Sequence, residues 1–286
     1  MGSLATLTRT LPLRRTWVGR ASPSFWAGLL MLAVLIAVAL FAVRLTGYDP
    51  IRQNFETILL PPSGAHPFGT DNFGRDVFAR VLYGTAIDLQ IGFLALLFPF
   101  CFGVVLGAVA GYYGGLVDSL LMRSVDVMTA FPFLVLVIAI VAFLGGGLTN
   151  MIIAISAVAW VPYARLVRAE VLVQKSMEYV QAARTLGFSR GRIILRHVLP
   201  NAITPAVVYA VSDVILIILT GSSLGFLGLG VKPPSPEWGL MIAEGRSFLF
   251  NGWWIATMPG LACLFTGITF TLLGDGLADL LRVKGQ

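Results

Sequence analysis

The longest uncharged stretch of the chain is VMTAFPFLVLVIAIVAFLGGGLTNMIIAISAVAWVPYA, residues 127–164. About 20 apolar residues are enough for one helix to cross the roughly 30 Å hydrocarbon core of a bilayer. This run is too long for one such helix, and the glycine triplet at 145–147 predicts a tight turn between two. The stretch therefore predicts an all-α membrane protein.

The composition of the whole chain supports this class. Only 12% of the 286 residues are charged and the mean hydropathy is +0.86, whereas soluble domains average about 25% charged residues. Both cysteines lie in apolar runs and there are only two histidines, so the chain has too few His and Cys side chains to form a metal cluster. We expect no metal site, no cofactor and no nucleic-acid partner in this chain.

Six segments are long and apolar enough to cross a membrane. They cover 25–43, 87–110, the two halves of 127–164, 202–227 and 248–274. A cleaved signal peptide is the alternative for the first, but its apolar stretch exceeds the roughly 7–15 residues of a signal core. The predicted organisation is a basic tail 1–24, a first transmembrane helix 25–44, an external segment 45–86, and a core 87–286 with five further spans and a basic loop at 165–201.

Basic residues gather on one side of this six-span arrangement. The tail, the loop 165–201, Arg123 and the C-terminal end together hold fourteen of the twenty Lys and Arg. Because Lys and Arg accumulate in cytosolic loops, we expect both termini and the basic loop in the cytosol, with 45–86 in the periplasm.

Two features inside the spans call for an explanation. Gly103, Gly107 and Gly111 recur every four residues and predict a flat helix face that another helix approaches closely. Asp213 lies in the middle of the fifth span, where an ionisable side chain is costly and usually faces a cavity or a partner. Two interpretations of Asp213 stay open: a position on a substrate pathway, or an interhelical hydrogen bond made by a neutral acid.

The basic loop leads into EYVQAARTLGFSRGRIILRHVLPNAITP, residues 178–205, which predicts two short helices. Gly187 is placed to end the first, and the second begins near Gly191 and leads back to the membrane at Pro200. The small pair Ala182-Ala183 allows another protein to approach, so the first helix would act as a lever on the spans joined to it. The alternative is an amphipathic segment held on anionic lipid by its arginines.

This loop resembles the EAA loop in the membrane subunits of bacterial binding-protein-dependent ABC importers. The family pattern is Glu-Ala-Ala, three residues, Gly, nine residues, then Ile-x-Leu-Pro. Its spacing is matched by Gln181-Ala182-Ala183, Gly187 and His197-Val198-Leu199-Pro200. Gln181 and His197 replace the family's Glu and Ile, and with Asn201 they resemble the branch that imports peptides, nickel, glutathione and opines.

Four further stretches resemble the second membrane subunit of that branch, and together they extend the resemblance over nearly the whole chain. They are HPFGTDNFGRDVFARVLYG (66–84), AGYYGGLVDSLLMRSVDVMTAFP (110–132), LGFLGLGVKPPSPEWGLMI (224–242) and LLGDGLADLL (272–281). The chain departs from the pattern at Gly221, where many relatives have Glu, and at Gly225, where many have Ser. It also departs at Ala278 and at 282–283, near the C-terminus. We place Gly221 and Ser222 with Asp213 on a possible pathway.

The resemblance implies a six-helix permease subunit that is not itself an enzyme, located in the bacterial cytoplasmic membrane. Paired with a homologous permease subunit, it would carry di- or oligopeptides; nickel, glutathione or opine-like solutes are the alternative. A periplasmic or lipid-anchored protein would deliver the substrate. Two ATPase subunits, or one fused pair, would bind ATP and Mg²⁺. They would contact the loop at Glu178, Gln181, Ala182, Ala183, Arg184, Gly187, His197, Leu199 and Pro200.

Other classes of function lack their motifs. None of the lysines follows a glycine, so the chain has no P-loop and ATP must be hydrolysed elsewhere. The acids of GTDNFGRD, residues 69–76, fall short of a Ca²⁺ ligand set, which favours a turn or a protein contact. A secondary transporter would carry coupling-ion acids and inverted repeats, and a membrane enzyme would show converging polar groups, but neither pattern is evident.

Overall fold

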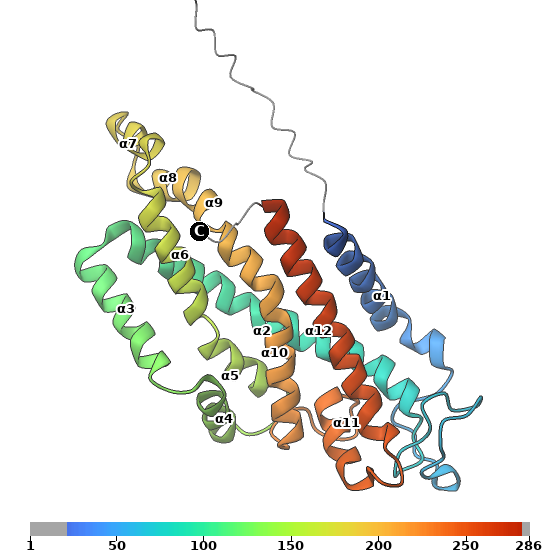
Figure 1. Ribbon diagram of the computed structural model, residues 1–286. Coiled ribbons are helices and arrows are strands. Elements are labelled where there is room, and N and C mark those ends of the chain that lie inside the picture. The colour runs from blue at the N-terminus through green and yellow to red at the C-terminus, as the bar shows by residue number, and fades with distance from the viewer. Residues whose placement is uncertain (1–21, 282–286) are drawn as a thin grey trace, which may run out of the picture.

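The computed structural model describes residues 22–281, which form α-helices and short helical turns (Figure 1). Within these residues the β-structure is limited to one isolated bridge between Thr70 and Asp76. The prediction of an all-α fold is confirmed. The basic tail predicted at 1–24 lies almost entirely outside the described residues.

Four long helices make up most of the described membrane-spanning structure. They are α1 (Pro23–Thr46), α2 (Val77–Tyr113), α10 (Thr204–Phe226) and α12 (Trp254–Leu281). The shorter elements are η1 (Phe55–Thr57), α3 (Gly115–Thr129), α4 (Phe133–Leu144), α5 (Leu148–Val158), α6 (Val161–Gln174), α7 (Glu178–Thr185), α8 (Arg190–Ile193), the π-helical turn η2 (Ile194–Val198), α9 (Leu199–Ala202), α11 (Trp238–Gly245) and η3 (Arg246–Phe248).

The uncharged stretch 127–164 turns at the predicted place but is built differently from two simple spans. Gly145 and Gly147 both adopt positive φ between α4 and α5, as the glycine triplet predicted. However, α4 has only 12 residues, about 18 Å of helix, which is too short to cross. Only together with α3, from which it is bent by 84°, is it long enough to form a candidate span. The following span joins α5 to α6 and continues to Gln174.

Two of the spans have bounds that differ from the predicted ones, because polar residues continue α2 at its start and α12 at its end. The second span was predicted from residue 87, but α2 begins at Val77, where the Asp76 carboxylate caps it by accepting from Ala79 N at 2.7 Å. The sixth was predicted at 248–274, whereas α12 runs from Trp254 to Leu281. Counting the bent pair as one, the described residues form six candidate spans.

The glycines of α2 lie against α6, and their spacing had predicted such a helix contact. A Cβ on Gly103 would lie 2.5 Å from the carbonyl oxygen of Trp160, and one on Gly111 would lie 2.9 Å from that of Arg168. Between them, a Cβ on Gly107 would collide with the carbonyl oxygen of Ala164. Only glycine lets the two helix backbones approach this closely.

Turns and short helices gather at two opposite ends of the molecule (Figure 1). At one end, α7, α8 and α9 project beyond the spans. At the other end lie α11, the turn between α4 and α5, and the non-membrane segment that joins α1 to α2. We call these the α7 end and the α11 end.

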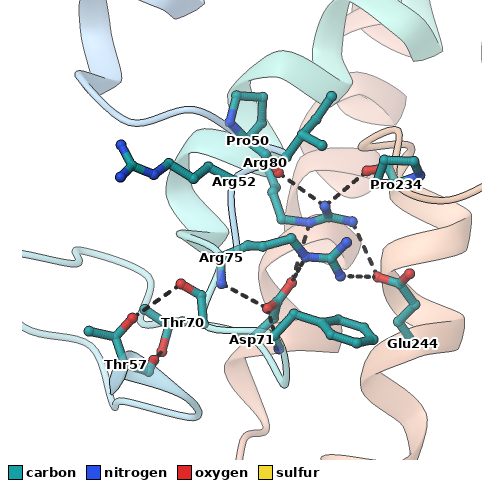
Figure 2. A network of polar contacts seen from close by, with 12 residues as sticks. Pro50, Arg52, Thr57, Thr70, Asp71, Arg75, Arg80, Pro234 and Glu244 are labelled. Carbon is teal, nitrogen blue, oxygen red and sulfur yellow. Dashed lines mark hydrogen bonds and ion pairs between the residues drawn. The ribbon is translucent and has the colours of Figure 1, made fainter. Parts of the chain in front are cut away.

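A buried network of charges holds the α11 end together (Figure 2). Arg75 and Arg80 are 2% and 1% exposed, and both contact Asp71 and Glu244 of α11. Arg80 also donates to the carbonyl oxygens of Pro50 and Pro234 at 3.1 and 3.2 Å. The network therefore fixes the segment between α1 and α2 onto α11, far away in the sequence.

Candidate functional site: the α7 segment and a cavity beside α10

The α7 segment connects α6 to α10 through the two predicted short helices. The first is α7, and the second begins with α8 at Arg190, one residue before the predicted Gly191. Polar contacts anchor its start: Lys175 Nζ donates to the carbonyl oxygen of Gly111 at 2.8 Å, and Gln181 Nε2 donates to that of Lys175 at 3.3 Å. The segment is therefore fastened directly to α2 and α6.

Gly187 ends α7 as predicted, with φ at +75°. Its N–H donates to the carbonyl oxygen of Arg184 at 2.9 Å, and the N–H of Phe188 donates to that of Ala183 at 3.2 Å. These two bonds form a Schellman motif, which requires a left-handed residue after the helix. The chain then reverses direction into α8.

The faces of α7 divide into an inner and an outer side. Val180 and Ala183 are buried in a core that includes Ile193 and Val198. The outer side carries Glu178, Gln181, Ala182 and Arg184, all exposed. The expected contact pair is therefore corrected: Ala182 is available to a partner, whereas Ala183 packs against the chain's own core because of its phase on the helix.

The remaining loop residues divide between support and surface. The His197 ring stacks on Phe188 with ring centres 5.8 Å apart, and its Nε2 is buried. Leu199 is half-buried and Pro200 is exposed. Leu186 and Leu195 are 71% and 68% exposed. Uncovered leucines beside a polar helix face provide apolar surface that a partner can bury.

Three arginines of the α7 segment lie over aromatic rings and not beside acids. Arg184 lies 5.5 Å from the ring centre of Tyr112, Arg190 lies 6.0 Å from that of Tyr113, and Arg192 lies 4.6 Å from that of Phe188. Such contacts orient guanidinium groups without neutralising them. This end of the described structure therefore presents positive charge on a shaped surface.

A second candidate site is a cavity of about 420 Å³ beside α10. Asp213 lies in its wall and accepts a hydrogen bond from the Tyr163 hydroxyl at 2.7 Å. The wall combines aromatic, aliphatic and hydroxyl side chains: Phe133, Leu134, Ala159, Pro162, Tyr209, Leu216, Ile217, Leu219, Thr220 and Ser223. Asp213 therefore has features of both interpretations that the sequence left open. It makes a hydrogen bond between two helices, and it also faces a cavity.

Gly221 and Ser222, predicted with Asp213, do not line this cavity. Gly221 packs against Ile91 and Met151, where a Cβ would lie 3.0 Å from Ile91 Cγ2. Ser222 is buried, and its Oγ lacks a hydrogen-bond partner within the described residues. The two residues face the interior because they lie on the side of α10 opposite the cavity; Thr220 and Ser223 line it instead.

A buried acid pair near Ser222 was missed by the sequence reasoning, which counted one acid inside the spans. Asp88 of α2 and Glu237 at the start of α11 are both 0% exposed, and their carboxyl groups interact. Asp88 Oδ2 accepts from Trp238 N at 3.2 Å. Asp88 lies near one end of the predicted second span. An acid at that position was the sign in the sequence that could have indicated a buried polar contact.

Glu237 caps α11 and occupies space left by a glycine. Its two carboxylate oxygens accept from Gly239 N and Leu240 N, both at 2.7 Å. A Cβ at Gly225 would collide with this carboxyl group, so the glycine at this departure from the family pattern makes room for Glu237. Burial raises the pKa of Glu237, because the charged form loses its hydration.

Neither site is built for a metal. Within residues 22–281, the side chains of His, Cys, Asp and Glu nowhere form a group of three or more placed to hold an ion. The two features support two different roles. The projecting α7 segment, which is fixed to two spans, can transmit movement to them, and the cavity with one acid can bind a ligand.

Comparison with known proteins identifies the family. Residues 103–284 match the family described as the inner membrane component of binding-protein-dependent transport systems. The chain belongs to this family. Residues 18–62 also match the N-terminal transmembrane domain of oligopeptide transport permease C. As a member of this family, the chain is a multi-pass protein of the inner membrane, and the resemblance seen in its loop is confirmed.

Curated relatives match along most of this inner-membrane component. The dipeptide transport system permease protein DppC of Alkalihalophilus pseudofirmus is 42% identical over 90% of this chain and 84% of its own length. The probable D,D-dipeptide transport system permease protein DdpC of Escherichia coli is 39% identical over 97% and 93%. The glutathione transport system permease protein GsiD of Pectobacterium atrosepticum is 42% identical over 90% and 86%.

Solved structures agree on the fold. A chain of the MetNI methionine ABC transporter in an inward-facing conformation aligns with a TM-score of 0.58, covering 72% of this chain and 96% of that one at 18% identity. The permease fold predicted from the resemblance is confirmed.

Proposed function

We propose that this chain is one permease subunit of an ATP-driven importer and forms, with a second homologous permease subunit, a pathway for di- or oligopeptides. The observation that carries the proposal is the identity of about 40% with peptide permeases over 90% or more of the chain. The projecting α7 segment and the cavity beside α10 supply the two parts that such a subunit needs.

The α7 segment is the proposed contact for ATPase subunits. Its outer side offers Gln181 and Ala182, with Leu186 beside them, and its inner side is packed on the chain's own core. Force applied to α7 is therefore transmitted to α6 through the core and to α2 through the bond between Lys175 and Gly111. ATP and Mg²⁺ would be held by the ATPase subunits alone.

The orientation follows from the same assignment. The α7 end carries the basic residues of the segment 165–201 and would face the cytosol. The α11 end would then face the periplasm, where a periplasmic or lipid-anchored binding protein delivers substrate. The segment 45–76 and α11, joined by their charge network, offer that protein a rigid surface.

Glutathione is the second candidate substrate, because a glutathione permease is as similar to this chain as the dipeptide permeases are. Both candidates are peptides, and both suit a cavity of about 420 Å³, since ligand sites of roughly 300–1,000 Å³ are common for small molecules. Nickel and opines belong to the same branch, but no group of side chains in the described structure favours them.

Reconstitution tests the proposal. The permease pair, its ATPase subunits and the binding protein are placed in proteoliposomes, and uptake of labelled dipeptide, tripeptide and glutathione is measured with and without ATP. We expect ATP-dependent uptake of at least one short peptide, and loss of that uptake when Ala182 is replaced by Trp. Uptake driven by an ion gradient without ATP would instead indicate a secondary transporter.

A further inference from the structure

Asp213 differs from Asp71 and Glu237, two other buried acids of the described structure, in what it contacts. Asp71 contacts two arginines, and Glu237 caps the N-terminus of α11. Asp213 is 6% exposed, and the Tyr163 hydroxyl at 2.7 Å is its hydrogen-bond donor. Among residues 22–281, no Lys or Arg lines the cavity that it faces. An acid at membrane depth is costly and usually faces a partner or a cavity, so a ligand cation in this cavity would supply the charged partner that the described side chains do not.

The rest of the cavity wall offers hydrogen-bond acceptors and aromatic faces. The hydroxyls of Thr220 and Ser223 already donate to the carbonyl oxygens of Leu216 and Leu219, each at 2.7 Å. Their free lone pairs therefore accept hydrogen bonds from a ligand. Tyr209 also lines the cavity, and aromatic faces attract cations.

We propose that Asp213 binds the α-ammonium group of a peptide passing through this cavity. The inference rests on the proposed function and adds the part of the substrate that this chain recognises. An ammonium group carries one positive charge and three donors, which suits the Asp213 carboxylate with the Tyr209 ring in the same wall. Thr220 and Ser223, about two to three turns further along α10, accept from other donors of the peptide. A peptide carboxylate would meet the same acceptors without a cation, so this wall selects the amino end of the substrate.

The assignment predicts discrimination between peptides with a free and a blocked amino group. The assay is ATP-driven uptake of labelled Ala-Ala and of N-acetyl-Ala-Ala by the complete reconstituted complex. Each peptide is supplied at the concentration that half-saturates the binding protein, which removes that protein's own preference. We expect wild type to favour the free peptide by roughly tenfold or more, since hydrogen bonds to charged groups contribute on that order.

Asp213→Asn removes the charge and keeps the shape of the side chain. It should lower uptake of Ala-Ala to the level of the N-acetylated peptide and leave uptake of the latter unchanged. Tyr163→Phe is the matched control, because it removes the hydrogen bond within the chain and keeps the carboxylate. This variant should retain the preference, whereas a purely structural role would make both variants lower both peptides equally.

Three results would overturn the assignment. The first is a wild-type complex that imports both peptides equally, a measurement that needs no variant to fold. The second is an Asp213→Asn complex that keeps the wild-type ratio. The third is failure of wild type to import either peptide with ATP, which overturns the proposed function as well. Co-purification of each variant with its ATPase subunits establishes that the complex has assembled.

Discussion

Two groups of arginines at opposite ends of the molecule have opposite surroundings. At the α11 end, Arg75 and Arg80 are buried and paired with Asp71 and Glu244. At the α7 end, Arg184 and Arg190 are exposed and lie over aromatic rings. The charges of the first group are paired within the chain and serve the fold. The second end leaves charge and apolar surface available, and its chemistry serves a partner.

The difference has an energetic meaning. Removing one partner from a buried ion pair leaves an uncompensated charge and costs about 3–5 kcal/mol, whereas exposed pairs contribute about 0–1 kcal/mol. Substitutions at the α11 end should therefore change stability, and substitutions on the outer side of α7 should change function alone.

The largest expected effect is that of Arg80→Met. The change leaves Glu244 with one arginine and the carbonyl oxygens of Pro50 and Pro234 without this donor. We expect the free energy of unfolding to fall by about 3–5 kcal/mol, measured by denaturation of the purified chain in mild detergent. Arg52→Met is the control, because Arg52 is exposed and points away from the network (Figure 2). Equal stability of the two variants would remove the distinction between the two ends.

A smaller effect is expected inside the α7 segment, where neighbouring alanines have opposite surroundings. Ala183→Leu adds volume to a packed core and should cost about 1–3 kcal/mol. Ala182→Leu lies on the outer side and should change stability by no more than about 0.5 kcal/mol. Despite its stability, the Ala182 variant should lose ATPase subunits in co-purification. Retention of those subunits by Ala182→Leu would argue against α7 as the contact.

Gly187 provides a third comparison within the same segment. Its φ of +75° is strained for any residue with a Cβ, and Gly187→Val should cost about 1–2 kcal/mol in local stability. Nothing within 4 Å would meet the added side chain, so the effect is conformational and not steric. Gly191→Val is the control, since it also lies in open space but has no positive φ. Hydrogen exchange across α7 should accelerate for the first variant alone.

The sequence predicted features that depend on local chemistry. The turn at Gly145–Gly147, the end of α7 at Gly187 and the glycine face of α2 all follow from residues close together in the chain. Contacts between distant residues were missed. The pair of Asp88 with Glu237 and the pair of Arg75 with Glu244 depend on how α11 packs against α2, which the local pattern does not specify.

The candidate site was predicted only in part, because local sequence patterns do not specify how the helices pack. Spacing located the α7 segment, but which alanine faces outward depends on the phase of a helix only two turns long. Asp213 was found because an acid among apolar residues stands out, and it does face a cavity. Gly221 and Ser222 were grouped with it by closeness in sequence, although the helix turns them toward the interior.

The smallest expected effect concerns an acid at the α11 end that the arginine network leaves unpaired. Burial raises the pKa of Glu237 above its ordinary value of 4.5, so the folded state holds this proton more tightly than the unfolded state. Its contribution to stability is therefore present at low pH and is lost as the pH rises from about 4.5 through the folded-state pKa. Linkage limits the slope to on the order of 1 kcal/mol per pH unit for one proton.

The measurement is the difference in unfolding free energy between wild type and Glu237→Gln across this pH range, in which the titration of groups that do not interact with Glu237 cancels to first order. The difference should shift against wild type as the pH rises, because glutamine does not titrate. Ser222→Ala keeps the titrating carboxyl group and should therefore keep a fall in stability with rising pH, in contrast to Glu237→Gln. A Glu237→Gln difference that stays flat would mean that Glu237 has the same pKa in the folded and unfolded states and ionises in place. The α11 end would then tolerate a buried negative charge without an arginine, which contradicts the contrast between the two ends.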